Sequence, residues 1–380
     1  EAAAEEFKRT EQFVRIAEDI ADLPYAWGRY DLLCLPPSFP YGGMENPCLT
    51  FVTPTLLAGD GSLANVVAHE ISHSWTGNLV TNETWSHFWL NEGWTMWLMR
   101  KIMAGIEESE GRNAAGYHGL DSLGGWKHLS DDVALFPGAA SRLVLELDDG
   151  DPDDAYSSVP YEKGFNLLHA LEQLVGEEAF LKFFRAYLQK FKYGTVTSGG
   201  FKTMFLDYFA MPEHREAGAK AEGFDWDAWL HGEGMPPGGA PGFDRSLAEE
   251  SEVLAASWLE YDEAWGAKAP DADLTSWTTD QKTWFLDVLL SKTEERSRPL
   301  SVNTISALKR TYSFHETRNA EVLNRFLLLA IASGDESVLP VATRFVTSQG
   351  RMKYVRPLYR ALRDSGPEGA KLARETFLSK

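Results

Sequence analysis

The sequence predicts an α+β fold that is mostly helical and is divided into two domains. The clearest strand-like stretches lie between residues 29 and 52, whereas apolar residues recur with a period near 3.6 through most of the remaining chain. A segment rich in proline and glycine, 236–245, interrupts the helical pattern and is the best candidate for a linker. We therefore expect one domain over 1–235 and a second over 246–380.

The first domain is expected to combine a few strands with several helices. The strand-like stretches are 29–35 and 48–52, separated by a glycine-rich irregular turn. Ser62 is a favourable N-cap for a helix that carries the chain's most informative motif. Helices are predicted over 5–22, 63–75, 90–103, 161–175 and 177–191.

The second domain is expected to be entirely helical. Its segments are mostly 3.6-periodic, and they begin near Ser246, Ser276, Val302, Asn319, Ser337 and Pro357. Although no sequence repeat is visible, successive helical hairpins of this length suit a short solenoid of the armadillo or HEAT type.

Charge and composition restrict the partners. The formal net charge of -20 disfavours nucleic acid and anionic membrane surfaces, because both repel a polyanion. No apolar run approaches the roughly 20 residues of a membrane span, and residues 1–6 lack the features of a secretion signal. With only Cys34 and Cys48, a disulfide scaffold is not expected. We expect a cytoplasmic protein, of unknown oligomeric state, that acts on small or cationic substrates.

A metal-binding pattern lies in the helix predicted over 63–75. His69-Glu70-Ile71-Ser72-His73 is an H-E-x-x-H sequence, and positions four apart on a helix are only about 40° apart around its axis. Both imidazoles can therefore reach one ion. A catalytic zinc takes a third protein ligand, and Glu92 is the best candidate because eighteen residues separate it from His73 and it begins the next predicted helix.

Glu70 projects from the predicted helix in a different direction from His69 and His73. Its carboxylate can take a proton from a zinc-bound water without coordinating the metal, so it is the predicted general base. The alternative is that His69 and His73 are ordinary helix residues, which a bare H-E-x-x-H pattern leaves open. The Asn91-Glu92-Gly93 sequence at this distance from His73 favours the metal-binding interpretation, with one zinc ion per chain.

Several motifs together resemble one enzyme family. The sequence is similar to the gluzincin zinc aminopeptidases, and within them to the leukotriene-A4 hydrolase family, in Pro40–Asn46, His69–His73, Gly77–Asn82, Trp89–Gly93, Tyr156–Lys163 and Gln349–Lys353. The resemblance covers nearly the whole chain. It implies a thermolysin-like catalytic domain to about residue 235, followed by the helical domain.

The resemblance also implies roles for individual residues, each of which has a structural alternative. Glu45 would bind the free α-amine of the substrate, and Tyr161 would stabilise the oxyanion of the intermediate. The other implied substrate-binding residues are Pro40, Tyr41, Gly42, Gly43 and Met44 at an edge for an extended peptide, Tyr156 in the pocket, Asp153 for water attack on a lipid epoxide, and Arg351, Met352 and Lys353 for a carboxylate. Without the family, Glu45 and Asp153 read as turn residues, Tyr161 as a core aromatic, and Arg351 and Lys353 as a solvated basic face.

Two departures from the family pattern are visible. Relatives carry an all-β domain ahead of the catalytic one, and the sequence is expected to lack it together with the first strands of the catalytic domain. Met99 stands seven residues after Glu92, where relatives commonly have Glu, so an acid that supports the ligands is expected to be missing.

These observations lead to one main function and two rivals. The sequence predicts a zinc aminopeptidase acting on short peptides, with a second activity as an epoxide hydrolase on a fatty-acid epoxide, because zinc suits both reactions as a Lewis acid. The first rival is a catalytically impaired, truncated relative that serves as a zinc-containing binding protein. The second is an endopeptidase, which Glu45 disfavours because its carboxylate would block an internal peptide segment.

Overall fold

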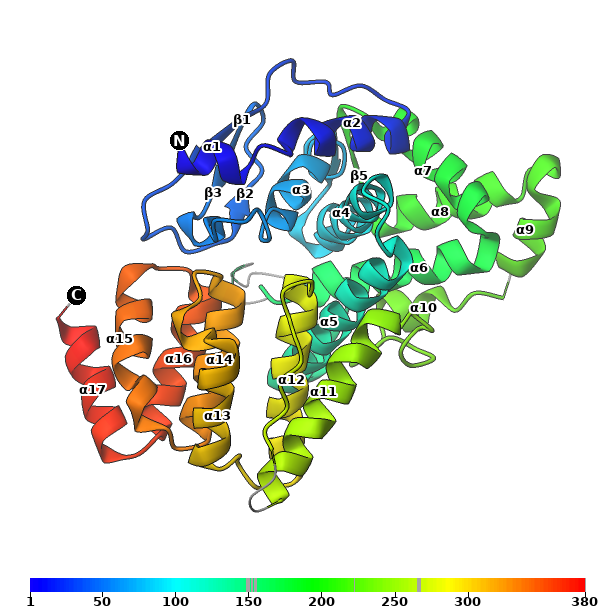
Figure 1. Ribbon diagram of the computed structural model, residues 1–380. Helices are drawn as coiled ribbons and strands as arrows, with labels where there is room; N and C mark the ends of the chain where they lie inside the picture. Colours follow the sequence, from blue (N-terminus) through cyan, green and yellow to red (C-terminus); the bar gives the residue numbers. More distant parts are fainter. Residues whose placement is uncertain (148–150, 152, 154–155, 222, 265–267, 380) are drawn as a thin grey trace.

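The computed structural model describes residues 1–147, 151, 153, 156–221, 223–264 and 268–379. Helices predominate and strands are few and short, which confirms the predicted α+β, mostly helical fold. In Figure 1 the helices of the second half, coloured yellow to red, stand side by side below the strands and helix α3 of the first half. The predicted domain boundaries at 235 and 246 stay predictions.

A three-stranded sheet lies beside the candidate site. Its order is β1-β3-β2, formed by Asp31–Cys34, Leu49–Val52 and Gly43–Met44. Strand β1 runs parallel to β3, and β2 runs antiparallel to it with Gly43 opposite Val52. The two predicted stretches are confirmed, and the glycine-rich turn between them contains the short edge strand β2. A second pair, β4 (Val80–Asn82) and β5 (Gly194–Val196), is parallel.

Ten helices in the described part of residues 1–235 surround these strands. They are α1 (Ala2–Glu6), α2 (Thr10–Ala21), α3 (Asn65–Ser72), α4 (Trp89–Ser109), α5 (Ala114–Leu135), α6 (Gly164–Val175), α7 (Glu177–Phe191), α8 (Ser198–Phe209), α9 (Arg215–Ala221) and α10 (Trp226–Leu230). A π-helical turn, η5 (Val159–Lys163), leads directly into α6. Helices α5, α8, α9 and α10 were not predicted.

Three helix predictions need correction. The helix expected over 5–22 is two helices, α1 and α2. Ser62 does not cap α3, whose N-cap is Ala64; the Ser62 hydroxyl instead accepts a hydrogen bond from the Asn319 amide of the second domain. The helix expected from residue 161 begins at Gly164, because residues 159–163 form the wider π-helical turn.

The described residues from 246 onward form only helices and the segments that connect them. The α-helices are α11 (Ser246–Glu263), α12 (Thr279–Glu295), α13 (Val302–Tyr312), α14 (Ala320–Ala332), α15 (Leu339–Ser348), α16 (Met352–Asp364) and α17 (Pro367–Leu378). Helix α12 packs on α11 and α14, and α16 packs on α14 and α17. Pro357 does not start a helix as predicted. It lies within α16, where its ring removes one backbone donor from the second turn.

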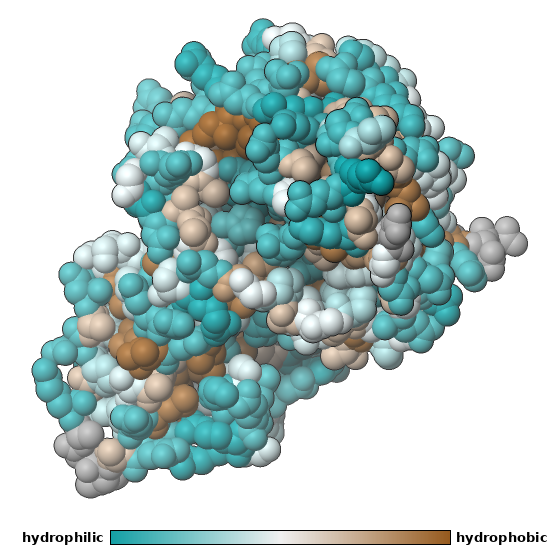
Figure 2. Space-filling view, turned by 90° about the vertical axis from the view of Figure 1, so that its right-hand side faces the viewer, coloured by the Kyte–Doolittle hydropathy of each residue, from teal (hydrophilic) through white to brown (hydrophobic). Residues whose placement is uncertain are grey.

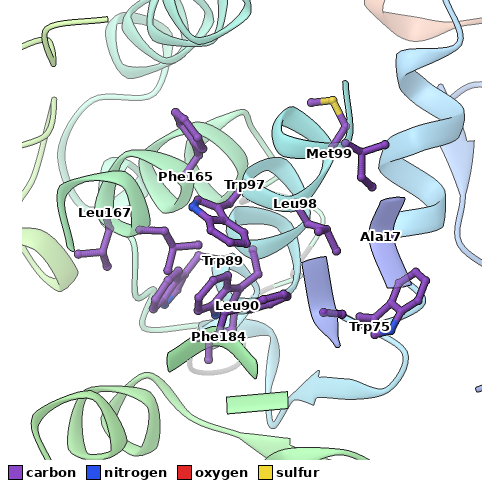
Figure 3. Packing of buried hydrophobic residues seen from close by; sticks show 14 of the residues in the cluster. Ala17, Trp75, Trp89, Leu90, Trp97, Leu98, Met99, Phe165, Leu167 and Phe184 are labelled. Carbon is purple, nitrogen blue, oxygen red and sulfur yellow. The ribbon is translucent and has the colours of Figure 1, made fainter. Parts of the chain in front are cut away.

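Helix α4 is the centre of the first hydrophobic core. Figure 3 shows Trp89, Trp97 and Leu98 of this helix among side chains from α2, α6 and α7. Trp94 is fully buried, with its ring 4.9 Å from that of Phe184 between centroids. Met99 is also buried in this core, so its thioether serves packing.

The surface is polar over most of the face that Figure 2 presents. Separate hydrophobic patches lie on both lobes of this face. No helix in the described ranges has the length and apolar character of a membrane span.

Substituting Gly93 tests how closely α4 approaches η5 and α6. A Cβ at Gly93 would lie 2.8 Å from the backbone of Gly164, so Gly93→Ala is expected to lower the free energy of unfolding by about 1–3 kcal/mol. Gly124→Ala in α5 is the matched control, because a Cβ there meets nothing within 4 Å. It is expected to stabilise the protein by about 0.5–1 kcal/mol. Equal denaturant-unfolding midpoints for the two variants would contradict the close approach.

Candidate metal centre

Helix α3 presents two imidazoles on one side. His69 lies in its last turn and His73 directly follows it, still in helical conformation. The two rings are 4.8 Å apart between centroids and meet edge to face. His73 is only 1% exposed and His69 16%, so the pair is reached from the side of His69.

Glu92 completes a triangle with these rings. It lies in the first turn of α4, and its Oε2 is 3.4 Å from His69 Nε2 and 3.3 Å from His73 Nε2. Ligands about 2.0–2.1 Å from a tetrahedral zinc are about 3.3–3.4 Å from one another. The structure therefore brings together the three residues whose spacing in the sequence predicted a common ion, and it places Glu92 at the separation from each imidazole that zinc requires.

The chemistry of the donor set also fits a cation. Glu92 Oε2 is buried and has no hydrogen-bond partner among the described residues, which is costly unless something positive binds it. Burial alone would raise the pKa of Glu92, but the two imidazoles outweigh burial and hold it at about 2. The carboxylate is thus charged and lacks a hydrogen-bond donor, as expected for a metal ligand.

Contacts behind His73 fix the orientation of its ring. Its Nδ1 is 2.9 Å from the Thr76 carbonyl oxygen, which only accepts, so Nδ1 carries a hydrogen and Nε2 is the nitrogen left to face Glu92. Thr95 Oγ1 lies 3.1 Å from the same Nδ1 and donates to Thr76 O. These partners were not predicted, because a backbone carbonyl has no sequence signal and Thr95 is one threonine among many.

Glu70 faces a second carboxylate in the same pocket. Potential ligand atoms of Glu45, Glu70 and His73 all lie within 4.8 Å of one another. A Cβ at Gly43 would lie 2.3 Å from Glu70 Oε1, so only glycine lets β2 pass this close to the carboxylate. Burial raises the pKa of Glu70 to about 8, and the charge of Glu45 adds to the rise. A carboxylate with such a pKa suits a group that accepts and returns a proton.

Tyr161 stands in the π-helical turn η5 beside the metal ligands. Its ring stacks on that of His69 at 6.0 Å between centroids, and its hydroxyl is 3.2 Å from that of Tyr156. Burial raises the pKa of Tyr161 well above its usual value, so the phenol keeps its proton and can donate it to a hydrogen bond. Sequence reasoning found Tyr161 but not the unusual backbone that presents it.

Six aromatic rings form a continuous line past the metal ligands. Neighbouring centroids are 5.3 to 6.2 Å apart along the series Phe39, Tyr41, Tyr156, Tyr161, Phe88 and Trp85. Tyr41, Tyr156 and Trp85 are each more than half exposed. Asp153 is also exposed, and its carbonyl accepts from the Tyr156 N–H, but residues 152, 154 and 155 lie outside the described residues. The line offers an apolar wall with hydroxyl groups.

The second domain reaches this site through residues 350–352. Gly350 N donates to Pro37 O at 2.6 Å and Met352 N to Pro40 O at 2.9 Å. Arg351 is 8% exposed, and its Nη2 would lie 2.9 Å from a Cβ at Gly42. The structure thus brings Arg351 against the strand edge that carries Gly42 and Gly43.

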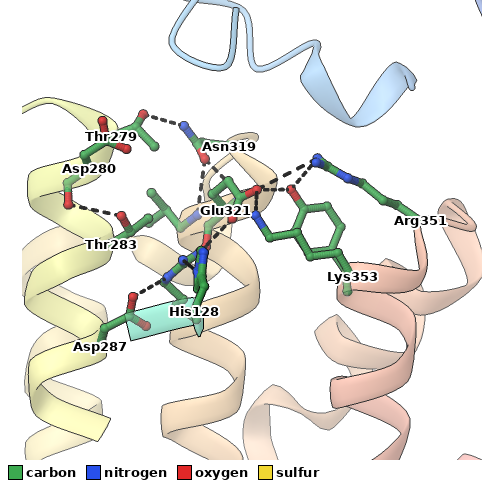
Figure 4. A network of polar contacts seen from close by, with 12 residues as sticks. His128, Thr279, Asp280, Thr283, Asp287, Asn319, Glu321, Arg351 and Lys353 are labelled. Carbon is green, nitrogen blue, oxygen red and sulfur yellow. Dashed lines mark hydrogen bonds and ion pairs between the residues drawn. The ribbon is translucent and has the colours of Figure 1, made fainter. Parts of the chain in front are cut away.

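Lys353 is held differently from Arg351. Figure 4 shows both in a polar network around Glu321, which lies in α14. Lys353 Nζ donates to Glu321 Oε1 at 2.6 Å, and Arg351 reaches the same oxygen through the Tyr354 hydroxyl. Glu321 was not predicted, because its only local signal is a place in the first turn of a helix that Asn319 caps.

Known proteins resemble the chain along its length. Residues 5–216 match the family profile described as the peptidase family M1 domain, and residues 277–380 match the leukotriene A4 hydrolase C-terminal profile. The chain is 46% identical over 374 residues to leukotriene A-4 hydrolase of Xenopus laevis, covering 95% of this chain and 57% of that protein. It is 42% identical over 355 residues to leucine aminopeptidase 2 of Ajellomyces capsulatus, covering 93% and 54%.

A solved structure resembles the fold of the whole chain. Yeast LTA4 hydrolase in complex with bestatin superposes with a TM-score of 0.90 at 35% identity, covering 100% of this chain and 61% of that one. The chain therefore spans little more than half the length of the curated relatives it matches.

Replacing Glu92 tests the metal centre directly. Glu92→Gln removes the charge between the imidazoles, so zinc affinity is expected to fall by about 10²-fold or more. Glu172→Gln is the control, since Glu172 is equally buried but pairs with Lys101. Zinc bound after dialysis, measured by elemental analysis, should be lost from the first variant only. Full zinc retention by Glu92→Gln would contradict the assignment.

Proposed function

The chain belongs to peptidase family M1, and from that premise we propose that it is a zinc-dependent aminopeptidase that removes the N-terminal residue of short peptides. The observation that carries the proposal is the carboxylate of Glu45 beside Glu70 and His73. An anion at this distance from the catalytic groups binds a free α-ammonium, and it excludes the neutral amide of an internal peptide segment.

The substrate backbone would add to the edge of the sheet at β2. Among the strands of the described residues, β2 pairs only with β3, so its other edge would be the place for an extended peptide. Gly42 and Gly43 allow close approach there, since any side chain would collide with Arg351 or Glu70. Pro40, Tyr41 and Met44 flank this path, and Met44 is 40% exposed.

His69, His73 and Glu92 would hold the zinc ion, which when bound supplies a Lewis acid for the scissile carbonyl and lowers the pKa of a water. Glu70 takes a proton from the attacking water and returns it to the leaving amine. The Tyr161 hydroxyl donates a hydrogen bond to the oxygen that becomes negative as the carbonyl is attacked. Each of these groups is held by a helix or the π-helical turn and not by a loose loop.

Arg351 would receive the carboxylate end of a short substrate. Its Nη1 is occupied by the Tyr354 hydroxyl, whereas Nη2 is directed toward Gly42 on the peptide path. Met352 N holds the neighbouring Pro40 carbonyl. Lys353, bound to Glu321, would contribute to the positive field behind Arg351 more than by direct contact. A guanidinium suits this task because it binds carboxylates through two nitrogens.

The side chain of the N-terminal residue would pack on the aromatic line. Its exposed members, Tyr41, Tyr156 and Trp85, offer apolar faces that stabilise an apolar residue by about 1.5–3 kcal/mol when it is fully covered. We therefore expect substrates with large apolar N-terminal residues. The net charge of -20 supports small or cationic substrates over nucleic acid, and we propose the cytoplasm as the location.

A second activity on a fatty-acid epoxide is favoured by one observation. The backbone of Asp153 is bonded to Tyr156, so an exposed acidic residue adjoins the aromatic line that passes the metal ligands. Such a line suits an acyl chain, and Arg351 suits its carboxylate. The relative from Xenopus laevis is named for a hydrolase of this kind. The alternative hypothesis, a catalytically silent zinc-containing binding protein, predicts no turnover of either substrate.

Turnover of aminoacyl p-nitroanilides tests the peptidase. The zinc-loaded protein is expected to hydrolyse substrates with a free amine and not their N-acetylated forms. Glu45→Gln should raise KM for the free amine by about 10²-fold, since a charged hydrogen bond contributes about 1.5–3 kcal/mol.

Glu70→Gln is the companion variant. It should keep its zinc and lose about 10²- to 10⁴-fold in kcat, because only proton transfer is removed. Activity that survives a chelator, or Glu45→Gln acting equally on acetylated substrates, would refute the aminopeptidase. No turnover by the fully loaded protein would favour the silent zinc protein.

The epoxide activity has a separate test. Asp153→Asn should lower hydrolysis of an allylic fatty-acid epoxide by about 10-fold or more while peptide turnover changes less than about 2-fold, because only the former needs an acid at this place. Product analysis by chromatography measures both. Equal loss of the two activities would mean that Asp153 only maintains the conformation of its loop and has no specific role in epoxide hydrolysis.

A further inference from the structure

Two buried charges follow Tyr161 directly in the chain. Glu162 is 5% exposed and Lys163 is 0% exposed, although both belong to a turn at the edge of the candidate site. A π-helical turn is rare and less favourable than an α-helical one, so contacts outside the turn must hold it. The two side chains supply such contacts in different directions.

Glu162 ties the turn to α4. Its two carboxylate oxygens accept from the Nη1 and Nη2 atoms of Arg100 at 3.0 and 3.1 Å. Arg100 is 2% exposed and also pairs with Asp121 of α5. This pair is a charged, two-pronged bond between adjacent elements, as in many protein cores.

Lys163 is more unusual, because no carboxylate pairs with it in the part of the chain that the structure describes. Its Nζ donates to three backbone carbonyls, those of Ser141 at 2.9 Å, Gly232 at 2.8 Å and Gly234 at 2.9 Å. An ammonium has three donors, and all three are used. Burial lowers the pKa of Lys163 to about 8, which reflects the cost of this arrangement. An apolar side chain would fill the space at lower cost.

Two of the three carbonyls, those of Gly232 and Gly234, belong to the segment where the first domain ends, and the third belongs to Ser141 in the turn that follows α5. Gly232 and Gly234 follow α10 and lead into the predicted linker, and Gly234 N donates to Ser141 Oγ at 2.7 Å. Lys163 therefore ties the turn that carries Tyr161 to the chain that connects the two domains. The backbone of the turn that carries Tyr161 is thereby held by contacts independent of those with α4.

From this geometry we infer that Lys163 is a positioning residue for Tyr161: its bonds to Ser141, Gly232 and Gly234 hold the π-helical turn so that the phenol faces the metal ligands. The inference rests on the proposed role of Tyr161 in peptide hydrolysis. It adds a residue that touches neither substrate nor metal, and whose effect passes through the backbone of residues 159–163.

A double-mutant cycle separates positioning from general stability. Lys163→Met in the zinc-loaded protein is expected to lower kcat by about 10- to 100-fold and to change KM by less than about 3-fold, since small displacements of a catalytic group act on the transition state. In the Tyr161→Phe background the same substitution should lower kcat by less than about 2-fold, because the hydroxyl that Lys163 positions is already absent.

Lys101→Met is the matched control. Lys101 is a mostly buried lysine of α4 that pairs with Glu172 and Glu177, away from η5. Its loss is expected to lower stability while leaving kcat within about 2-fold in both backgrounds. Lys163→Gln, which keeps part of the hydrogen bonding, should give an intermediate kcat and serves if Lys163→Met does not fold.

Hydrogen exchange gives a readout that does not depend on turnover. Peptides covering residues 159–166 should exchange faster in Lys163→Met than in the parent protein, and at the parent rate in Lys101→Met. Equal losses of kcat with and without the Tyr161 hydroxyl, or unchanged exchange in this segment, would overturn the positioning role. If Tyr161→Phe itself keeps full activity, the proposed role of Tyr161 fails instead, so the two failures are distinguishable.

Discussion

The close packing of helix α4 is the constraint on which the candidate metal centre depends. Its first turn carries Glu92, the next residue lies against the backbone of Gly164, and Thr95 lies one turn below, behind His73. A small displacement of this helix would therefore move three parts of the site together. These are the ligand Glu92, the Thr95 hydroxyl behind His73, and the turn that carries Tyr161. The aromatic core around Trp94 holds the helix in place.

Three buried charges lie at the π-helical turn η5 and on the face of helix α4 that it packs against. Arg100, Glu162 and Lys163 are nearly inaccessible, and each carries the desolvation cost of a charge in an apolar interior. Apolar side chains would serve stability better at these positions. Their concentration around the π-helical turn is therefore better explained by a need for one exact backbone placement beside the metal ligands.

The metal ligands could be predicted from the sequence because their arrangement depends on local helix geometry. His69 and His73 were predictable as a pair because four positions on a helix define a direction, and Glu92 because a motif marked it. The same reasoning failed where distant partners decide the outcome. Ser62 looked like a helix cap but bonds Asn319 from the second domain. The π-helical turn depends on Arg100 and on carbonyls near residues 141 and 232, which no local pattern connects.

The junction between the two domains is made by main-chain atoms at its closest point. Gly350 and Met352 donate their N–H groups to the carbonyls of Pro37 and Pro40, so the side chains there take no part in these bonds. Replacing Met352, Pro40 or their neighbours can therefore change the lining of the proposed substrate path and still leave both main-chain acceptors in place. Gly350, by contrast, is fixed, because a Cβ there would lie 2.7 Å from the Ser38 carbonyl oxygen.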